Sequence, residues 1–321
     1  MKFNAPRGTN DILPPDTLKW QYIEKKTHEI FSNYNYQEIR TPIFEYTELF
    51  QRGIGEVTDI VEKEMYTFED KGGRSITLRP EGTASVIRSF LENKIYGQAQ
   101  PTKYYYIGPM FRYERPQSGR FRQFHQLGVE AIASNDPALD AEIISLGMRL
   151  LQDFGLSDLE LHLNSVGCGE CRPAYVDQLK DYLNQNKEQL CDNCRSRIER
   201  NPLRVLDCKN ENCQLVIKDA PKITDNLCQS CDDHFDNVQE YLDILDLDYI
   251  INPLLVRGLD YYTNTAFEIK DNALGAQDTV FGGGRYNGLA EEIGNRDLPG
   301  IGFALGIERL LLSLEACRIR C

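Results

Sequence analysis

Two strand-like segments joined by a short polar loop constrain the fold of this chain more than any other feature. Residues 103–113 are rich in tyrosine, phenylalanine and isoleucine, and residues 121–132 have an extended pattern again. The residues between them are polar and include Pro116 and Gly119, which favour a turn. Two strands joined in this way form an antiparallel hairpin.

Side-chain alternation along this hairpin predicts a polar wall. Residues of one strand that share a face include Met110, Arg112 and Glu114, and those of the other include Gln126, Gly128 and Glu130. A polar sheet face is costly to bury unless something fills it. The wall therefore predicts a ligand site.

Helical and strand patterns alternate along the rest of the chain and predict an α+β fold. We expect helices over 18–31 and 81–91, an extended segment over 36–44, strands over 251–262 and 265–270, and a glycine-rich turn at 282–284. A final strand from Gly300 should run into an apolar helix. Residues 168–249 are charged, cysteine-rich and mostly helical in pattern. We therefore predict a core made of residues 1–167 and 250–321, interrupted by an inserted domain over 168–249.

Eight of the ten cysteines form closely spaced pairs within the insertion. The pairs are Cys168 and Cys171, Cys191 and Cys194, Cys208 and Cys213, and Cys228 and Cys231. Such pairs have the spacing of zinc knuckles, so four of them could build two four-thiolate zinc sites. The alternative is that one site forms and the other cysteines are simply buried. Cys317 and Cys321 have no such partners, and no role is assigned to them.

Composition narrows the functional classes. The 321 residues, 41% of them hydrophobic, suffice for one large or two moderate globular units. A formal charge of -13 gives no basic face for nucleic acid. Any RNA contact needs a local patch such as Arg195, Arg197, Arg200 and Arg204, for which a salt-bridged helix face is an equal alternative. The sequence has no apolar stretch that could span a membrane and no signal-peptide pattern, so we expect a cytoplasmic protein.

Several charged groups could bind a small polar ligand. Arg112 and Arg120, near Glu114, could clamp a triphosphate, although a solvated loop is the common alternative. Arg309 follows a glycine-rich strand that permits close approach of a phosphate. Residues 257–262 combine Arg257 with Tyr261 and Tyr262, which suits an imidazole or forms a buried ion pair among core tyrosines. The carboxylates Glu81 and Glu130 could hold a cationic amine and an imidazole N–H.

These segments resemble class II aminoacyl-tRNA synthetases. Residues 34–50 are similar to the first class II motif, which builds the dimer interface; residues 108–130 and 302–309 are similar to the second and third. Residues 257–262 and 283–286 are similar to two motifs specific to histidyl-tRNA synthetases. The resemblance covers nearly the whole chain and is weakest over 168–249.

The resemblance implies a class II antiparallel sheet flanked by helices, a homodimer, and activation of L-histidine with ATP and Mg²⁺ before transfer to tRNA(His). It implies that Arg257 and Arg112 are catalytic and that Arg112, Glu114, Arg120 and Arg309 bind ATP. The histidine site would comprise Glu81, Gly82, Thr83, Arg112, Gln126, Glu130, Arg257, Tyr261 and Tyr262. Structural Zn²⁺ in the insertion is a hypothesis from the cysteine spacing and not from the resemblance.

Two alternative functions follow from features in which this sequence departs from the family pattern. The family normally has an anticodon-binding domain after the third motif, and its absence here fits a histidine-sensing regulatory subunit of ATP phosphoribosyltransferase. The complete set of arginines favours the enzyme. The cysteine-rich insertion also leaves open a zinc-dependent RNA-binding module on an inactive core.

Overall fold

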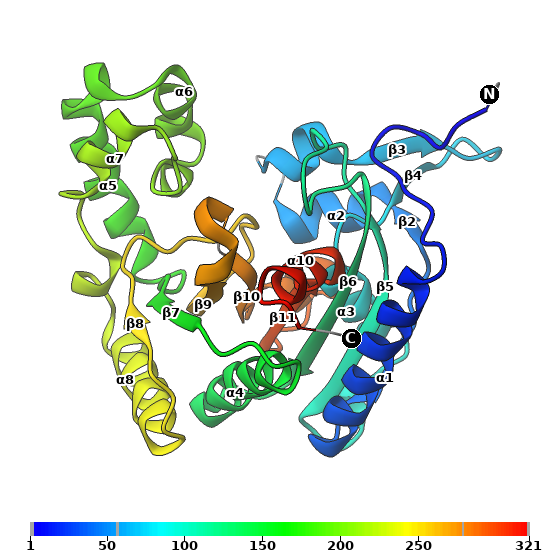
Figure 1. Cartoon of the computed structure of the whole chain (residues 1–321). Coiled ribbons are helices and arrows are strands. Elements are labelled where there is room, and N and C mark those ends of the chain that lie inside the picture. The colour runs from blue at the N-terminus through cyan, green and yellow to red at the C-terminus, as the bar shows by residue number, and fades with distance from the viewer. Residues whose placement is uncertain (1–2, 56–57, 278, 320–321) are drawn as a thin grey trace.

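A large, mostly antiparallel sheet forms the centre of the protein (Figure 1). The computed structural model describes residues 3–55, 58–277 and 279–319. In this part of the chain the sheet has the strand order β1-β5-β6-β11-β10-β9-β7-β8. Its strands are β1 (Gln37–Glu38), β5 (Thr102–Phe111), β6 (Gln123–Ile132), β7 (Leu159–Ser165), β8 (Ile250–Ile251), β9 (Thr263–Asp271), β10 (Thr279–Arg285) and β11 (Gly300–Gly306). The edge pairs β1–β5 and β7–β8 are parallel, and the inner pairs are antiparallel.

The predicted hairpin is confirmed as β5 and β6. Gly108 lies opposite Gln126, and Tyr104 lies opposite Glu130. β5 ends at Phe111, but the Arg112 backbone N–H still donates to the Arg122 carbonyl at 2.9 Å, so the pairing extends one residue beyond the strand.

Helices cover both faces of the sheet because its strands bury side chains on both sides. One face packs against α1 (Asp16–Asn33) and α4 (Pro137–Asp153), where Leu127 and Val129 of β6 are fully buried. The other face meets α3 (Thr83–Glu92) and α9 (Leu289–Gly294). The predicted helices over 18–31 and 81–91 are thus confirmed as α1 and α3, and the strand from Gly300 runs into α10 (Ile307–Ala316) as expected.

Two local predictions are wrong. Residues 251–262 do not form one strand: β8 ends at Ile251, and residues 252–262 form a loop. Pro253 lacks the backbone N–H that a strand interior needs, and Gly258 adds flexibility. Residues 282–284 do not form a turn; they lie inside β10, where a Cβ at Gly283 would come within 2.2 Å of the Gly302 carbonyl oxygen.

The insertion is mostly helical, as its pattern predicts. It contains α5 (Arg172–Gln185), α6 (Asp192–Arg200), α7 (Glu211–Ile217) and α8 (Gln229–Ile244). The first three form their own small core around Tyr175, and they stand to one side of the sheet (Figure 1). By contrast, α8 packs Phe235, Val238 and Leu242 into the main core beside α4. The insertion is therefore attached to the sheet along its last helix.

A second, three-stranded sheet lies at the edge of the core. Its strands are β2 (Phe44–Tyr46), β4 (Ser75–Leu78) and β3 (Tyr66–Glu69), and α2 (Thr47–Ile54) follows β2. Short helical turns occupy Ile60–Glu64, Ile95–Gly97, Lys187–Gln189, Pro202–Val205, Ile223–Asp225 and Asn272–Gln277. Among the helices of the described residues, none has the length and apolar character needed to cross a membrane.

Candidate active site

A cavity of about 170 Å³ opens on the sheet face that carries Gln126 and Glu130. It brings together seven of the residues that the sequence analysis selected: Glu81, Thr83, Arg112, Gln126, Arg257, Tyr261 and Tyr262. They come from the start of α3, the hairpin and the loop before β9, which are far apart in the sequence. The glycines of β10 and β11 supply part of the floor through Gly282 and Gly302.

Glu130 lies directly beneath this floor and is buried. A Cβ at Gly302 would come within 2.1 Å of its Oε2, so the glycine leaves room for the carboxyl group. The Thr83 hydroxyl donates to Glu130 Oε1 at 2.7 Å, and the Tyr286 hydroxyl donates to Oε2 at 2.6 Å. Burial raises the pKa of Glu130 to about 8, against the opposing effect of these two hydrogen bonds and with a further increase from the charge of Glu81. The group is therefore poised to give up a proton when a cation binds.

Glu81 is a second buried carboxylate at the edge of the cavity. It accepts hydrogen bonds from the backbone N–H groups of Thr83 at 2.6 Å and Ala84 at 2.9 Å, at the start of α3. Burial nevertheless raises its pKa. Gly82 does not line the cavity in the described structure; it provides space for the Tyr106 ring, which a Cβ would meet at 2.3 Å.

Three tyrosines form the apolar part of the site. The rings of Tyr261 and Tyr262 lie 4.7 Å apart, and that of Tyr286 lies 5.9 Å from Tyr261. Burial raises the pKa of all three phenols, so at neutral pH they remain hydrogen-bond donors. Tyr286 was absent from the predicted site residues, although it belongs to the segment 283–286 that signalled the family.

Arg257 presents its guanidinium group to the cavity from the loop before β9. Its Nη1 lies 2.5 Å from Glu268 Oε1, and its Cζ lies 5.5 Å from the centre of the Tyr262 ring. A Cβ at Gly282 would meet Nη1 at 2.4 Å, so glycine at this position makes room for the cation. Glu268 was missed by the sequence analysis, because a lone carboxylate on a strand has no motif to mark it.

The remaining predicted ligand-binding groups gather at the hairpin loop. Arg112 donates from Nε to the Pro80 carbonyl at 2.8 Å, and Glu114 lies 3.9 Å from Arg112 and 3.7 Å from Arg120. Arg309, in the first turn of α10, lies beside the same loop: a Cβ at Gly119 would sit 3.5 Å from its Cγ. Glu114, Arg120 and Arg309 are not among the described lining residues of the cavity.

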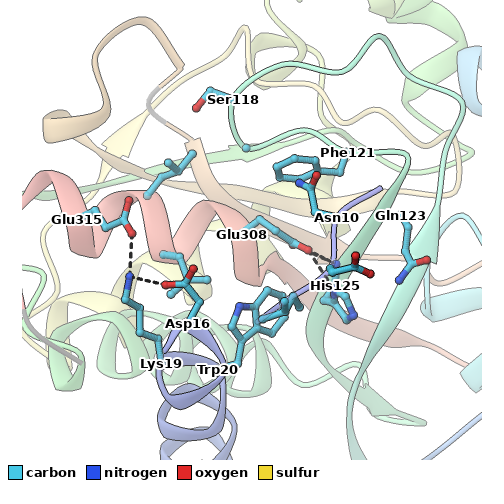
Figure 2. A pocket seen from close by; sticks show the side chains of 15 residues that line it. Asn10, Asp16, Lys19, Trp20, Ser118, Phe121, Gln123, His125, Glu308 and Glu315 are labelled. Carbon is cyan, nitrogen blue, oxygen red and sulfur yellow. Dashed lines mark hydrogen bonds and ion pairs between the residues drawn. The ribbon is translucent and has the colours of Figure 1, made fainter. Parts of the chain in front are cut away.

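A larger cavity of about 280 Å³ lies on the other side of the hairpin loop, next to α1 and α10 (Figure 2). Glu308 accepts a hydrogen bond from the His125 backbone N–H at 3.0 Å and contacts its ring Nδ1, and Trp20 packs edge-on against that ring. His125 therefore points away from Gln126 and Glu130 and ties β6 to α10.

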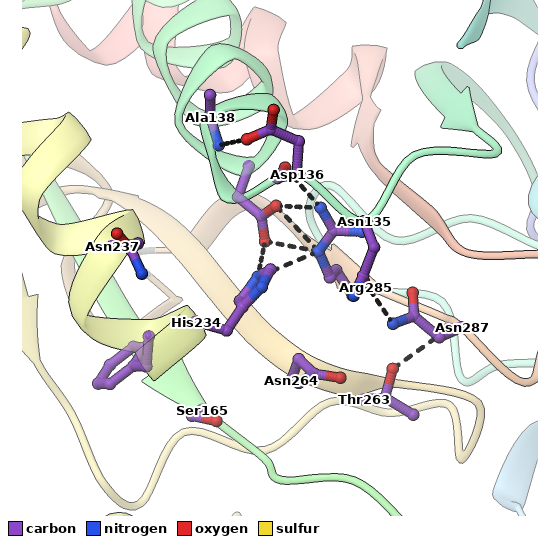
Figure 3. A network of polar contacts seen from close by, with 12 residues as sticks. Asn135, Asp136, Ala138, Ser165, His234, Asn237, Thr263, Asn264, Arg285 and Asn287 are labelled. Carbon is purple, nitrogen blue, oxygen red and sulfur yellow. Dashed lines mark hydrogen bonds and ion pairs between the residues drawn. The ribbon is translucent and has the colours of Figure 1, made fainter. Parts of the chain in front are cut away.

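Arg285 does not reach the cavity, although it stands beside Tyr286. It is fully buried, with its Nε 2.9 Å from Asp140 Oδ2, and it donates to the carbonyl oxygens of Ser134 and Asp136 (Figure 3). His234 of α8 lies 3.2 Å from the same aspartate. This network joins β10, α4 and the last helix of the insertion.

The cysteine pairs meet in two groups of four. One group contains Cys168, Cys171, Cys228 and Cys231, and the other contains Cys191, Cys194, Cys208 and Cys213. Within each group all four sulfurs lie within 4.8 Å of one another, and none of the eight takes part in a disulfide in the described structure. Each group can therefore offer four ligands to a single metal ion. Cys317 is exposed, and Cys321 lies outside the described residues.

The four insertion arginines are engaged within the chain. Arg197 lies 2.9 Å from Asp59 Oδ2, and Arg200 pairs with Glu62. Arg204 lies 3.5 Å from Asp207, and Arg195 donates to the carbonyl oxygens of residues 187 and 188. The structure thus shows the salt-bridged alternative, and Arg197 and Arg200 connect the insertion to the core.

Class II aminoacyl-tRNA synthetases have this architecture of an antiparallel sheet that carries an arginine-bearing hairpin and ends in a glycine-rich strand and helix. The crystal structure of apo S. aureus histidyl-tRNA synthetase matches it with a TM-score of 0.81 and 47% identity, covering 99% of this chain and 75% of that one. The family model for histidyl-tRNA synthetase matches residues 8–310. The histidine–tRNA ligase of Halothermothrix orenii is 72% identical over 315 residues, which are 98% of this chain and 75% of that protein. The chain belongs to the histidyl-tRNA synthetase family.

A second solved structure is similar in fold alone. The structure of an ATP phosphoribosyltransferase regulatory subunit/histidyl-tRNA synthetase from Bacillus halodurans matches with a TM-score of 0.68 at 22% identity, covering 100% of this chain and 84% of that one. The much higher identity to histidine–tRNA ligases favours the enzyme over the regulatory alternative.

Proposed function

We propose that this chain activates L-histidine with ATP, giving histidyl-adenylate and pyrophosphate, and then transfers the histidyl group to tRNA(His). One observation carries the proposal: a single cavity, beneath which the buried Glu130 lies, brings the buried Glu81 and buried tyrosines beside the half-buried guanidinium group of Arg257. The carboxylates and tyrosines suit the cationic amino group and the imidazole N–H of histidine. The guanidinium suits the phosphate that its carboxylate attacks.

Histidine recognition divides between the two carboxylates. Glu81, Thr83 and Gln126 are assigned to the amino group, and Gln126 Oε1 is buried without a hydrogen-bond partner among the described residues. Such an atom is costly unless a ligand donates to it. Glu130, Tyr261 and Tyr262 are assigned to the imidazole. Tyr286 holds Glu130 in place through its hydroxyl group.

Activation requires the histidine carboxylate oxygen to form a bond to the α-phosphorus while the bond to pyrophosphate breaks. Arg112 and Arg257 are placed to offset the negative charge that develops on the α-phosphoryl oxygens. One preorganised donor of this kind typically lowers the barrier by ~2.7–4 kcal/mol. Arg120 and Arg309 are assigned to the outer phosphates, with Glu114 orienting the arginines. Mg²⁺ would neutralise the phosphates, and Glu64 and Glu114 offer the oxygen ligands that it prefers.

A homodimer is part of the proposal. Ile43, Phe44, Tyr46 and Phe68 are exposed together on or beside the three-stranded sheet, in and next to the segment similar to the first class II motif. Contiguous apolar side chains of this kind mark protein interfaces. We also place the protein in the cytoplasm and structural zinc in its insertion, where the two four-sulfur groups support it.

Histidine-dependent exchange of pyrophosphate into ATP tests the reaction. We expect exchange by the native chain and its loss in Arg257→Ala, whereas Arg149→Ala, which removes an exposed arginine on α4, should retain it. Binding of histidine without any exchange by the native chain would support a regulatory protein instead.

A further inference from the structure

The two four-sulfur groups lie at opposite ends of the insertion. The base group (Cys168, Cys171, Cys228 and Cys231) lies where the chain leaves β7 and where α8 begins. The tip group (Cys191, Cys194, Cys208 and Cys213) lies between α6 and α7. The first cysteine pair thus meets the fourth, and the second meets the third. This nested arrangement closes the insertion at both ends.

We propose that each group binds one structural zinc ion and that the ion at the base group positions the tyrosines of the histidine site. The second part rests on the proposed function. Sulfur spacing supports a single ion. Cys168 Sγ lies 3.9 Å from Cys171 Sγ and 3.7 Å from Cys228 Sγ, and Cys171 Sγ lies 3.8 Å from Cys231 Sγ.

These distances match a tetrahedral site. Zinc–sulfur bonds of ~2.3 Å place each pair of sulfurs ~3.8 Å apart. A disulfide would bring two sulfurs to ~2.05 Å, and a cluster of several iron atoms would need more space between the ligands. In the tip group, Cys191 Sγ lies 3.9 Å from Cys208 Sγ. Tetrahedral sites of four thiolates are typical of zinc or of iron–sulfur centres, and we assign zinc.

Donors around the sulfurs resemble the outer shell of a metal site. The backbone N–H of Cys168 donates to Cys171 Sγ at 3.2 Å, and the Asn264 side chain donates to Cys231 Sγ at 3.3 Å. Gly167 has a positive φ of 66°, and a Cβ there would lie 2.8 Å from Cys171 Sγ. The backbone is therefore shaped around the sulfurs, and Asn264 brings β9 into contact with the group.

A direct connection runs from the base group to the histidine site. Arg172 follows Cys171 and donates to the carbonyl oxygens of Val166 at 3.0 Å, Gly167 at 3.1 Å and Tyr262. Tyr262 lines the histidine cavity. Placing Cys171 therefore places Arg172, and Arg172 fixes the backbone of Tyr262. Arg172 is a positioning residue and does not line the cavity.

The opposite side of the base group is fixed to the core. His234, one turn after Cys231, joins the buried pair of Asp140 and Arg285 (Figure 3). Cys228 and Cys231 thus stand on a helix anchored to the sheet, whereas Cys168 and Cys171 stand on the loop that leads into α5. An ion bound by both cysteine pairs would hold Cys171, and with it Arg172, in a fixed position relative to α8.

The test combines metal content with ligand binding in the full chain. Zinc and iron are measured by elemental analysis, and the dissociation constants of histidine and ATP are measured by calorimetry. The variants are Cys171→Ser with Cys231→Ser, which removes the base site, and Arg172→Met, which keeps all eight cysteines. Arg195→Met is the matched control, because Arg195 also donates to two carbonyl groups of the insertion but lies at its tip.

We expect two zinc ions in the native chain and one in the double cysteine variant. Arg172→Met should keep both ions yet raise the histidine dissociation constant about tenfold, because Tyr262 loses a hydrogen bond from a charged group, with little change for ATP. Arg195→Met should keep native affinities. If the double variant does not fold, Arg172→Met still decides the positioning role.

Iron in place of zinc, or fewer than two ions in the native chain, would overturn the metal assignment. Native histidine affinity in Arg172→Met would overturn the positioning role. A chain that holds two zinc ions and binds histidine but does not exchange pyrophosphate would refute the proposed reaction and leave this inference intact.

Discussion

Replacing Glu130 with glutamine should make the protein more stable at neutral pH while it weakens histidine binding. Glu130 is 1% exposed, and the hydroxyl groups of Thr83 and Tyr286 donate hydrogen bonds to its carboxyl group. Ionising a carboxyl group in such a place is costly, which is why its pKa rises from 4.5 to about 8. Glutamine has nearly the same shape and never ionises.

The size of this gain in stability follows from the link between folding and protonation of Glu130. Between pH 4.5 and 7 the carboxyl group is ionised in the unfolded chain and still protonated in the folded one. The protonated carboxyl group therefore makes its full contribution to the free energy of unfolding below pH 4.5, and this contribution is lost as the pH rises through 8. At ~1.4 kcal/mol per unit, the loss over about 2.5 pH units reaches ~3 kcal/mol at pH 7. The glutamine variant avoids this loss.

Urea unfolding of both proteins at pH 5, 6, 7 and 8 measures the effect. The difference in unfolding free energy, variant minus native, should grow with pH and approach ~3 kcal/mol at pH 7. Glu240→Gln, at an exposed position, controls for the general effect of removing a charge. A difference that stays constant or shrinks with rising pH would show that Glu130 is ionised in the folded protein and would refute the reasoning.

The same proton links stability to recognition. If the imidazole N–H binds best to the ionised carboxylate, histidine binding at pH 7 must displace a proton from Glu130. Calorimetry in buffers of different ionisation enthalpy should detect this release in the native chain and not in Glu130→Gln. Ionised Glu130 would then lower the stability of the free protein and strengthen histidine binding, a trade-off between stability and activity that is common at functional sites.

Three further predictions concern neighbouring groups. Asp140→Ala should lower the unfolding free energy by ~3–5 kcal/mol because it leaves the Arg285 guanidinium buried and unpaired. Asp153→Ala on the same helix breaks only an exposed pair and should cost under ~1 kcal/mol; equal losses in urea unfolding would contradict this. Gly282→Ala should displace the Arg257 guanidinium and reduce pyrophosphate exchange, with little change in histidine affinity. Arg257→Ala should lower turnover far more than histidine affinity, and a reversed pattern would remove its assigned role.

Periodicity predicted the scaffold well because it reports directly on burial. α1 buries one face, and its apolar spacing in the sequence reflects that. The hairpin strands are buried on both sides of the sheet, and their aromatic and aliphatic composition reflects that. The segment before β9 was mistaken for a strand because its apolar residues and tyrosines have the same composition as a buried strand. Those tyrosines are buried against the cavity from a loop, which composition alone cannot distinguish from a sheet.

The sequence alone did not predict which side chains of different segments come into contact. The spacing within each cysteine pair predicts a turn with two sulfurs on one side, but which pairs meet depends on the path of the chain between them. The same holds for Glu268, which contacts Arg257 because the loop before β9 folds back along that strand. Glycines 282–284 were expected in a turn, and the side chains and carbonyl groups that require them there come from other strands.

The insertion supports the loop that lines the proposed histidine site. The loop at 257–262 lies outside the sheet ladders, so few strand hydrogen bonds hold it. Instead, the insertion contacts it repeatedly: Asn201 donates to Asp260 at 2.9 Å, Arg204 donates to the Arg257 carbonyl at 3.4 Å, and Arg172 donates to Tyr262. Each polar contact of this kind contributes only ~0.5–1.5 kcal/mol to stability. If the loop and the insertion were both mobile, the entropy cost of ordering them would offset this contribution. They can hold the loop only if the insertion is already rigid, which is what closure by four sulfurs at each end would provide.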